Sequence, residues 1–79
     1  MIEWKRETTK EDICCNEEKE IIIDFCDRIA ISSSEISILF FAVKECMQKN
    51  KNIFFKLRKN ILREVLEEMG FEKLGVKFI

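Results

Sequence analysis

The segment 53–69, which reads IFFKLRKNILREVLEEM, constrains the fold most because its apolar residues recur with the period of a helix. On a helical wheel they occupy one continuous arc, and most of the basic residues lie opposite that arc. The pattern predicts an amphipathic helix over 53–69. We expect this helix to end at Gly70, because glycine adopts the left-handed conformation of a helix C-terminus at low cost.

Arg58 is the exception within this segment, since it falls in the middle of the apolar arc. A guanidinium group in that position must extend to solvent, pair with a carboxylate or bind a partner. Arg58 is therefore a candidate partner-binding residue.

Two further helices are predicted from capping signals. Thr8 and Thr9 each precede an acidic residue by three positions, which predicts a helix over 10–30. Ser32 precedes Glu35 by the same spacing and predicts the start of a helix over 33–49. Within that second helix the run ISILFFAV would also suit a buried strand, but the cap and the helical period of the second half favour a helix.

The connections between these segments suggest how they pack. The polar link 49–52 is short enough to return the chain, which predicts an αα-hairpin of helices 33–49 and 53–69. Segments 1–8 and 71–79 alternate weakly in polarity, and we expect these ends to pair as strands because a lone strand is unstable. The sequence thus predicts a mainly α fold: one compact three-helix domain with a small β element formed by the chain ends.

The distribution of apolar residues indicates where in the cell the protein acts. The chain has 79 residues and a net charge of −1, and it contains no apolar run long enough to span a membrane. Its first ten residues lack the apolar region of a signal peptide. We therefore predict a cytoplasmic protein without a membrane partner.

The four cysteines do not have the spacing of a metal site. Structural zinc sites use close pairs such as Cys-x2-Cys, whereas Cys14, Cys15, Cys26 and Cys46 form no such pair and the chain has no histidine. All four fall on predicted apolar arcs, where cysteine behaves as a small hydrophobe. We predict reduced thiols, no metal and no cofactor.

Catalysis has few candidate residues. The chain has no histidine to act as a general base, only two glycines and no phosphate-binding loop. The run Ser32-Ser33-Ser34 is interpreted as a helix cap rather than as a source of nucleophiles. We therefore predict a protein that is not an enzyme and has no small-molecule substrate.

The back of helix 33–49 suggests a binding surface. Ile38 and Phe41 lie opposite its main apolar stripe, and aromatic and arginine residues commonly anchor interfaces. Together with Arg58 they predict a protein–protein interaction module, an adaptor, regulator or inhibitor, that binds another protein or forms a homodimer. The alternative is that the N-terminal segment or the terminal strands cover Ile38 and Phe41 within one molecule.

The charges are segregated along the chain. Residues 1–35 contain ten acidic and five basic residues, whereas residues 36–63 contain one acidic and seven basic residues. A basic block either pairs with the acidic block or meets an anionic partner. The alternative function is therefore a small nucleic-acid-binding regulator that uses the basic face of helix 53–69. Its candidate residues are Lys51, Asn52, Lys56, Lys59 and Arg63.

Overall fold

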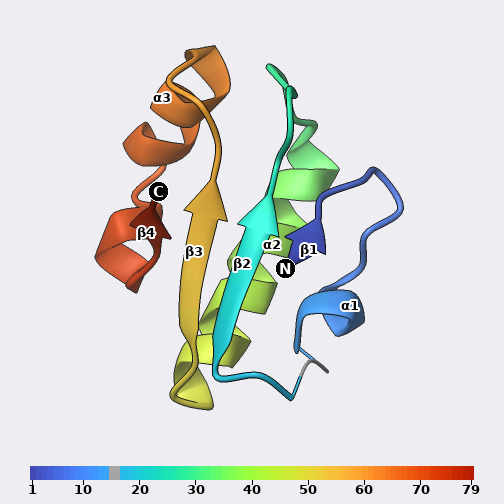
Figure 1. Cartoon of the computed structure of the whole chain (residues 1–79), viewed down its shortest axis with the longest axis vertical. Coiled ribbons are helices and arrows are strands. Elements are labelled where there is room, and N and C mark those ends of the chain that lie inside the picture. Colours follow the sequence, from blue (N-terminus) through green and yellow to red (C-terminus); the bar gives the residue numbers. More distant parts are fainter. Residues whose placement is uncertain (15–16) are drawn as a thin grey trace.

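The fold is taken from a computed structural model, which describes residues 1–14 and 17–79 (Figure 1). Its centre is a four-stranded sheet in which every neighbouring pair of strands is parallel. The strands lie in the order of the sequence: β1 (Ile2–Glu3), β2 (Glu20–Asp24), β3 (Asn52–Lys56) and β4 (Lys77–Phe78).

Helices connect successive strands. The chain is therefore an α/β domain, as expected where strands and helices alternate. The helices are α1 (Lys10–Cys14), α2 (Ser33–Gln48), α3 (Ile61–Glu68) and the 3-10 helix η1 (Phe71–Leu74).

The prediction of a mainly α three-helix domain is wrong. The predicted helix over 10–30 contains the short helix α1 and the strand β2, and the predicted helix over 53–69 contains most of β3, a loop and α3. No αα-hairpin forms, because α2 is followed by a strand. The reason is that a short segment with many apolar residues fits the apolar face of a helix and a buried strand equally well. Pairing with neighbouring strands then favours the strand.

The strand β2 is built from three consecutive isoleucines, a β-branched residue type that suits a pleated strand. Ile21 and Ile23 are fully buried, whereas Ile22 between them is only half-buried. The following Phe25 is buried on the same side as Ile21 and Ile23. This alternation has the period of two that defines the faces of a strand.

The strand β3 repeats this pattern in register with β2. Ile53 and Phe55 are buried, and Phe54 between them is half-buried. Ile21 pairs with Ile53 and Ile23 with Phe55, so the buried residues of the two strands share one face of the sheet.

The helix α2 lies where a helix was predicted over 33–49, and its first turn has the predicted cap. Ser32 Oγ accepts a hydrogen bond from the Glu35 backbone N–H at 3.2 Å, and the Glu35 carboxylate accepts one from the Ser32 backbone N–H at 3.2 Å. This capping box satisfies two backbone donors that the helix itself leaves unpaired.

The start of α3 was missed by the sequence analysis. Asn60 caps it, because the Asn60 side chain accepts a hydrogen bond from the Arg63 backbone N–H at 3.0 Å. Gly70 follows the helix with a left-handed φ of 86°, which suits the glycine predicted at this helix end.

The two chain ends do not pair with each other. β1 pairs with β2 and β4 pairs with β3, so the ends form opposite edges of the sheet. The predicted ribbon of 1–8 with 71–79 is therefore wrong, because each end found a central strand that the sequence analysis had assigned to a helix.

One hydrophobic core joins all the described elements. Ile13 of α1, Leu39 of α2, Leu62 of α3 and Phe71 of η1 are buried in the same cluster as the inward residues of β2 and β3. Aromatic rings pack against one another within this core: Phe25 lies edge-on to Phe55 with the two ring centroids 5.2 Å apart. The elements therefore form a single domain with its helices on one face of the sheet.

On the opposite face of the sheet, the described residues form no helix. In Figure 1 the strands β2 and β3 lie in front of α2, and no described element lies in front of them. Ile22 and Phe54, which point to this side, do not belong to the core cluster. Within 1–14 and 17–79, the helices thus cover one face of the sheet and leave the other bare.

Candidate functional site

A hollow of about 890 Å³ lies where β1 and β2 end and α2 begins. In α/β proteins the carboxyl ends of parallel strands commonly form binding sites, because the loops diverge there. Its walls come from the loop after β1, the loop after β2 and the first turns of α2. The lining residues are Lys5, Arg6, Asp27, Arg28, Ile29, Ala30, Ile31, Ser32, Ser34, Glu35 and Ile38.

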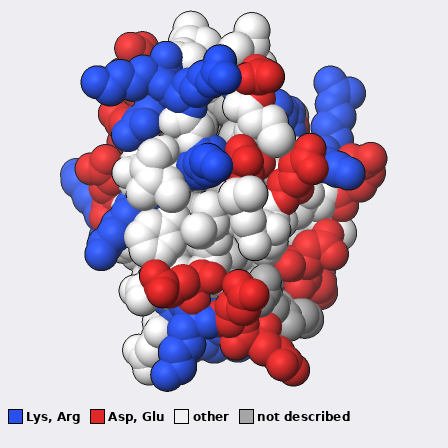
Figure 2. Space-filling view, viewed as in Figure 1, with Lys and Arg blue, Asp and Glu red and all other residues white. Residues whose placement is uncertain are grey.

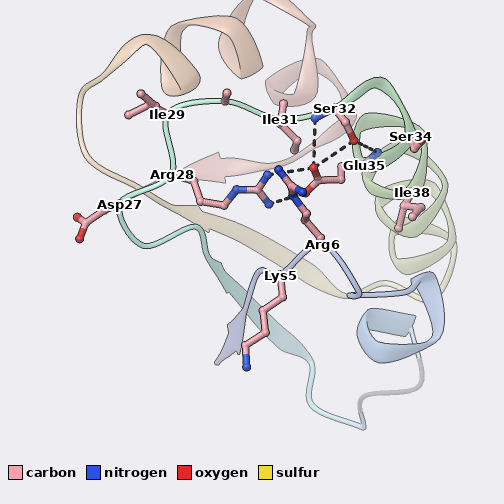
Figure 3. Close-up of a pocket in the computed structure, with 11 residues that line it drawn as sticks. Lys5, Arg6, Asp27, Arg28, Ile29, Ile31, Ser32, Ser34, Glu35 and Ile38 are labelled. Atoms are coloured by element: carbon pink, nitrogen blue, oxygen red, sulfur yellow. Dashed lines mark hydrogen bonds and ion pairs between the residues drawn. The ribbon is translucent and has the colours of Figure 1, made fainter.

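A buried glutamate organises this cavity (Figure 3). The Glu35 carboxylate accepts hydrogen bonds from both terminal nitrogens of Arg28, and Arg28 Nη2 lies 3.0 Å from Glu35 Oε1. It also accepts a hydrogen bond from Trp4 Nε1 at 2.7 Å and one from Ser32 Oγ at 3.1 Å. Glu35 thus joins the loop after β1, the loop after β2 and α2.

These donors set the protonation state of Glu35. The hydrogen bonds from Arg28 are the main cause that lowers the pKa of Glu35 to about 2, and the Ser32 and Trp4 donors add to this shift. The same pair raises the pKa of Arg28. Both groups are therefore charged at neutral pH, and a carboxylate with so low a pKa is a poor general base.

The rest of the cavity has a basic character. Its lining includes the basic residues Lys5, Arg6 and Arg28 and the acidic residues Asp27 and Glu35. Arg28 and Glu35 neutralise each other as an ion pair. In Figure 3 the Lys5 side chain points away from the Arg28–Glu35 pair, and Asp27 lies at the rim. The arrangement can attract an acidic group, and Ile38 provides an apolar contact beside it.

The predicted binding residues Ile38 and Phe41 lie on the same side of α2. Ile38 is half-buried and lines the cavity, whereas Phe41 is 65% exposed. The spacing of three residues places Phe41 one turn beyond Ile38, and Ser34 lies one turn before it. We call Ser34, Ile38 and Phe41 the α2 surface.

Arg58 lies elsewhere. It follows β3 in a loop, with 85% of its side chain exposed, and its Nη1 lies 3.9 Å from Asp27 Oδ1. It lines a second hollow of about 610 Å³ together with Lys56 and Ile79. The interpretation of Arg58 as a basic residue inside a helical apolar arc is wrong because this part of the chain is not a helix.

The five residues proposed for nucleic-acid binding do not share one helix face, because the helix 53–69 that would carry them is not formed. Asn52 and Lys56 lie at the two ends of β3, and Lys51 precedes it. Lys59 and Arg63 line a small hollow of about 200 Å³.

Arg63 already has several contacts in the protein. Its Nε donates a hydrogen bond to Glu67 Oε1 at 3.0 Å, and its Nη1 donates one to the Leu57 carbonyl at 3.1 Å. Its guanidinium carbon also lies 5.6 Å from the centre of the Phe78 ring. This arginine therefore stabilises the C-terminal part of the fold.

The cysteines differ in exposure. Cys14 and Cys46 are buried with free thiols, and burial is the main cause that raises the pKa of each. Cys26 is exposed, so its prediction as a core thiol is wrong: it follows β2 in a turn with φ of 54°, where its backbone N–H bonds Asp24 Oδ1 at 2.8 Å. Cys15 lies outside the described residues.

Neither a metal-binding cluster nor a membrane-spanning helix is present among the described residues. Within 1–14 and 17–79, no group of three or more cysteine or carboxylate side chains is placed to hold a metal ion. In the same ranges, no helix is long and apolar enough to cross a membrane.

Two features of the structure were not predicted from the sequence. Trp4 and Arg28 were not recognised as partners of Glu35, although a single tryptophan near the N-terminus and a glutamate in a capping box were visible. The half-buried pair Ile22 and Phe54 on the bare side of the sheet was assigned to helical core arcs. If 20–25 and 52–57 are interpreted as strands, their side chains alternate between two faces, and Ile22 and Phe54 fall on the face opposite the core.

Comparison with known proteins gives no relative: no family model, no curated protein and no solved structure matches this chain.

Proposed function

We propose that the protein acts by binding another protein through the α2 surface and the adjoining cavity. The observation that carries this proposal is Phe41, a large aromatic side chain that is 65% exposed on α2. It lies one turn beyond Ile38, which lines the hollow of about 890 Å³. Burial of such a ring contributes roughly 1.5–3 kcal/mol, so an exposed one beside a hollow is a suitable anchor for a partner.

The charges around this surface favour a partner with an acidic segment. Lys5, Arg6 and Arg28 outnumber Asp27 and Glu35 in the cavity wall, and Ile38 adds an apolar contact toward Phe41. A partner that places a carboxylate in the cavity and an apolar side chain on Phe41 would match both features.

The surface is also rigidly held. Glu35 fixes the start of α2 to Trp4 and Arg28, so the residues of the first three turns are already positioned before a partner binds. Preorganisation of this kind reduces the entropy lost on binding.

Affinity capture from extracts of the native host tests the proposal. Phe41→Glu should abolish capture of the specific partner, whereas Ile61→Glu should not, because Ile61 is 63% exposed on α3 and belongs to neither the α2 surface nor the cavity lining. Both substitutions are at exposed positions, so the unfolding free energy should change by about 0.5 kcal/mol or less. Partner capture that Phe41→Glu leaves intact would contradict the proposal.

Nucleic-acid binding stays the alternative, and a nuclease arm of the same experiment tests it. Partners held by the α2 surface should resist nuclease treatment. Loss of every captured partner on nuclease treatment would instead favour the alternative, and Lys56→Gln with Lys59→Gln should then weaken binding and reduce its salt dependence.

A further inference from the structure

The bare face of the sheet has an apolar centre. Ile22 pairs with Phe54 in the β2–β3 register, and both side chains are half-buried without joining the core cluster. Lys77 of β4 lies on the same face, with its Nζ 6.0 Å from the centre of the Phe54 ring. Parallel sheets almost always have both faces covered, so an uncovered one is a strong sign of an interface.

Charges divide this face into two halves. On the side of β1 and β2 it carries Glu3, Glu20 and Asp24. On the side of β3 and β4 it carries Lys56 and Lys77. Figure 2, which looks onto this face, shows uncharged side chains at its centre between charged ones.

We propose that a second copy of this chain covers the bare face, and that the two copies are related by a two-fold axis that runs parallel to the strands between β2 and β3. This rotation exchanges the acidic and basic halves of the face, so the acidic half of each copy meets the basic half of the other. A face with this division of charge is complementary to itself, which is the requirement of a two-fold interface.

The strand register makes the contacts specific. In the strand register, Asp24 of β2 lies beside Lys56 of β3, and Ile22 lies beside Phe54 two residues earlier. Under the proposed rotation, Asp24 of each copy faces Lys56 of the other, and Ile22 of each copy packs on Phe54 of the other. Two sheets packed in this way lie about 10 Å apart with their strands nearly aligned.

The size of the face predicts the strength of the dimer. Two central strands of five residues and two edge strands of two residues make a small sheet. Strands lie about 4.8 Å apart and rise about 3.3 Å per residue, which sets the area of this face. The total area that the two copies would bury is therefore below the roughly 1,200 Å² of typical stable complexes. We therefore expect a weak dimer that dissociates at micromolar concentrations.

Charge reversal tests the pairing directly. Asp24→Lys alone places two lysines opposite each other at both of the 24–56 contacts between the copies, and Lys56→Glu alone places two carboxylates there. Each variant should therefore be monomeric at concentrations where the wild type is dimeric. An equal mixture of the two variants should form a one-to-one heterodimer, because both contacts then join opposite charges. Sedimentation measures the association, and native mass spectrometry distinguishes the heterodimer by mass.

Two matched variants separate this interface from other effects. Asp24→Asn keeps an oxygen that can accept the hydrogen bond from the Cys26 N–H but loses both ion pairs, so the dissociation constant should rise roughly tenfold. Phe41→Glu changes the α2 surface of the proposed function and should leave the dimer intact. A dimer lost with Phe41→Glu but unaffected by Lys56→Glu would overturn the proposal.

Three other outcomes would also overturn it. The first is a wild type that stays monomeric at millimolar concentration. The second is a Lys56→Glu variant that associates as strongly as the wild type. The third is a mixture of two folded variants that shows no heterodimer where the wild type is dimeric. None of these results bears on the α2 surface, so the proposed function and this interface can fail separately.

Discussion

Glu35 is the residue on which most of the candidate site depends. It completes the capping box of α2, pairs with Arg28 and accepts the Trp4 side chain, although only 6% of its side chain is exposed. A buried carboxylate is costly unless its oxygens are satisfied, and here both oxygens accept hydrogen bonds. This one side chain therefore joins local helix capping to tertiary structure.

The low pKa of Glu35 predicts how stability depends on pH. Its pKa is about 2 in the folded protein against an ordinary value of 4.5, so the stabilisation it provides is complete above pH 4.5 and is lost as the pH falls toward 2. Glu35→Gln should lower the unfolding free energy at pH 7 by roughly 2–3 kcal/mol.

Urea unfolding at several pH values measures this effect. The difference between the wild type and Glu35→Gln should shrink as the pH falls from 4.5 to 2. Glu68→Gln, at an exposed position on α3, serves as the control and should follow the wild type. A difference that stays constant with pH would show that Glu35 is not held as a carboxylate by Arg28.

The element β3 explains why the fold differs from the predicted one. Phe54 and Phe55 both belong to the apolar arc of a helix drawn over 53–69, but in the strand they point to opposite faces of the sheet. Phe55 is fully buried among aromatic rings, and Phe54 is not part of the core. Arg58, which interrupted the helical arc, lies just beyond the end of the strand.

Alanine substitution at these neighbouring positions separates a strand from a helix. Phe55→Ala should lower the unfolding free energy by roughly 3–5 kcal/mol, as expected for a large buried side chain. Phe54→Ala should cost about 1 kcal/mol or less when the protein is dilute enough to be monomeric. Equal costs in urea unfolding would contradict the strand and support the helical arc.

At the scale of the whole molecule, stability depends on pairing between distant segments. β2 and β3 each have a neighbouring strand on both sides, whereas β1 and β4 are edge strands of two residues. We expect native-state hydrogen exchange to be slowest for amides of β2 and β3 and faster in the edge strands. The loop 58–60 should exchange rapidly, and continuous protection over 53–69 would contradict this fold.

Several local features were predictable from the amino-acid sequence alone. Ser32 and Glu35 predicted the start of α2, and Gly70 marked the end of the following helix. Ile38 and Phe41 were also placed on one side of α2. Each of these depends on interactions within a few residues, which a local pattern contains.

Contacts between distant segments determine which apolar segments become strands and which surfaces these strands leave open. A segment such as 20–25 becomes a strand because a second strand lies beside it and binds its backbone, and no local pattern records that neighbour. The same pairing placed Arg28 beside Glu35 and left Ile22 and Phe54 on a bare face. The candidate site and the proposed interface therefore follow from contacts between segments far apart in the chain.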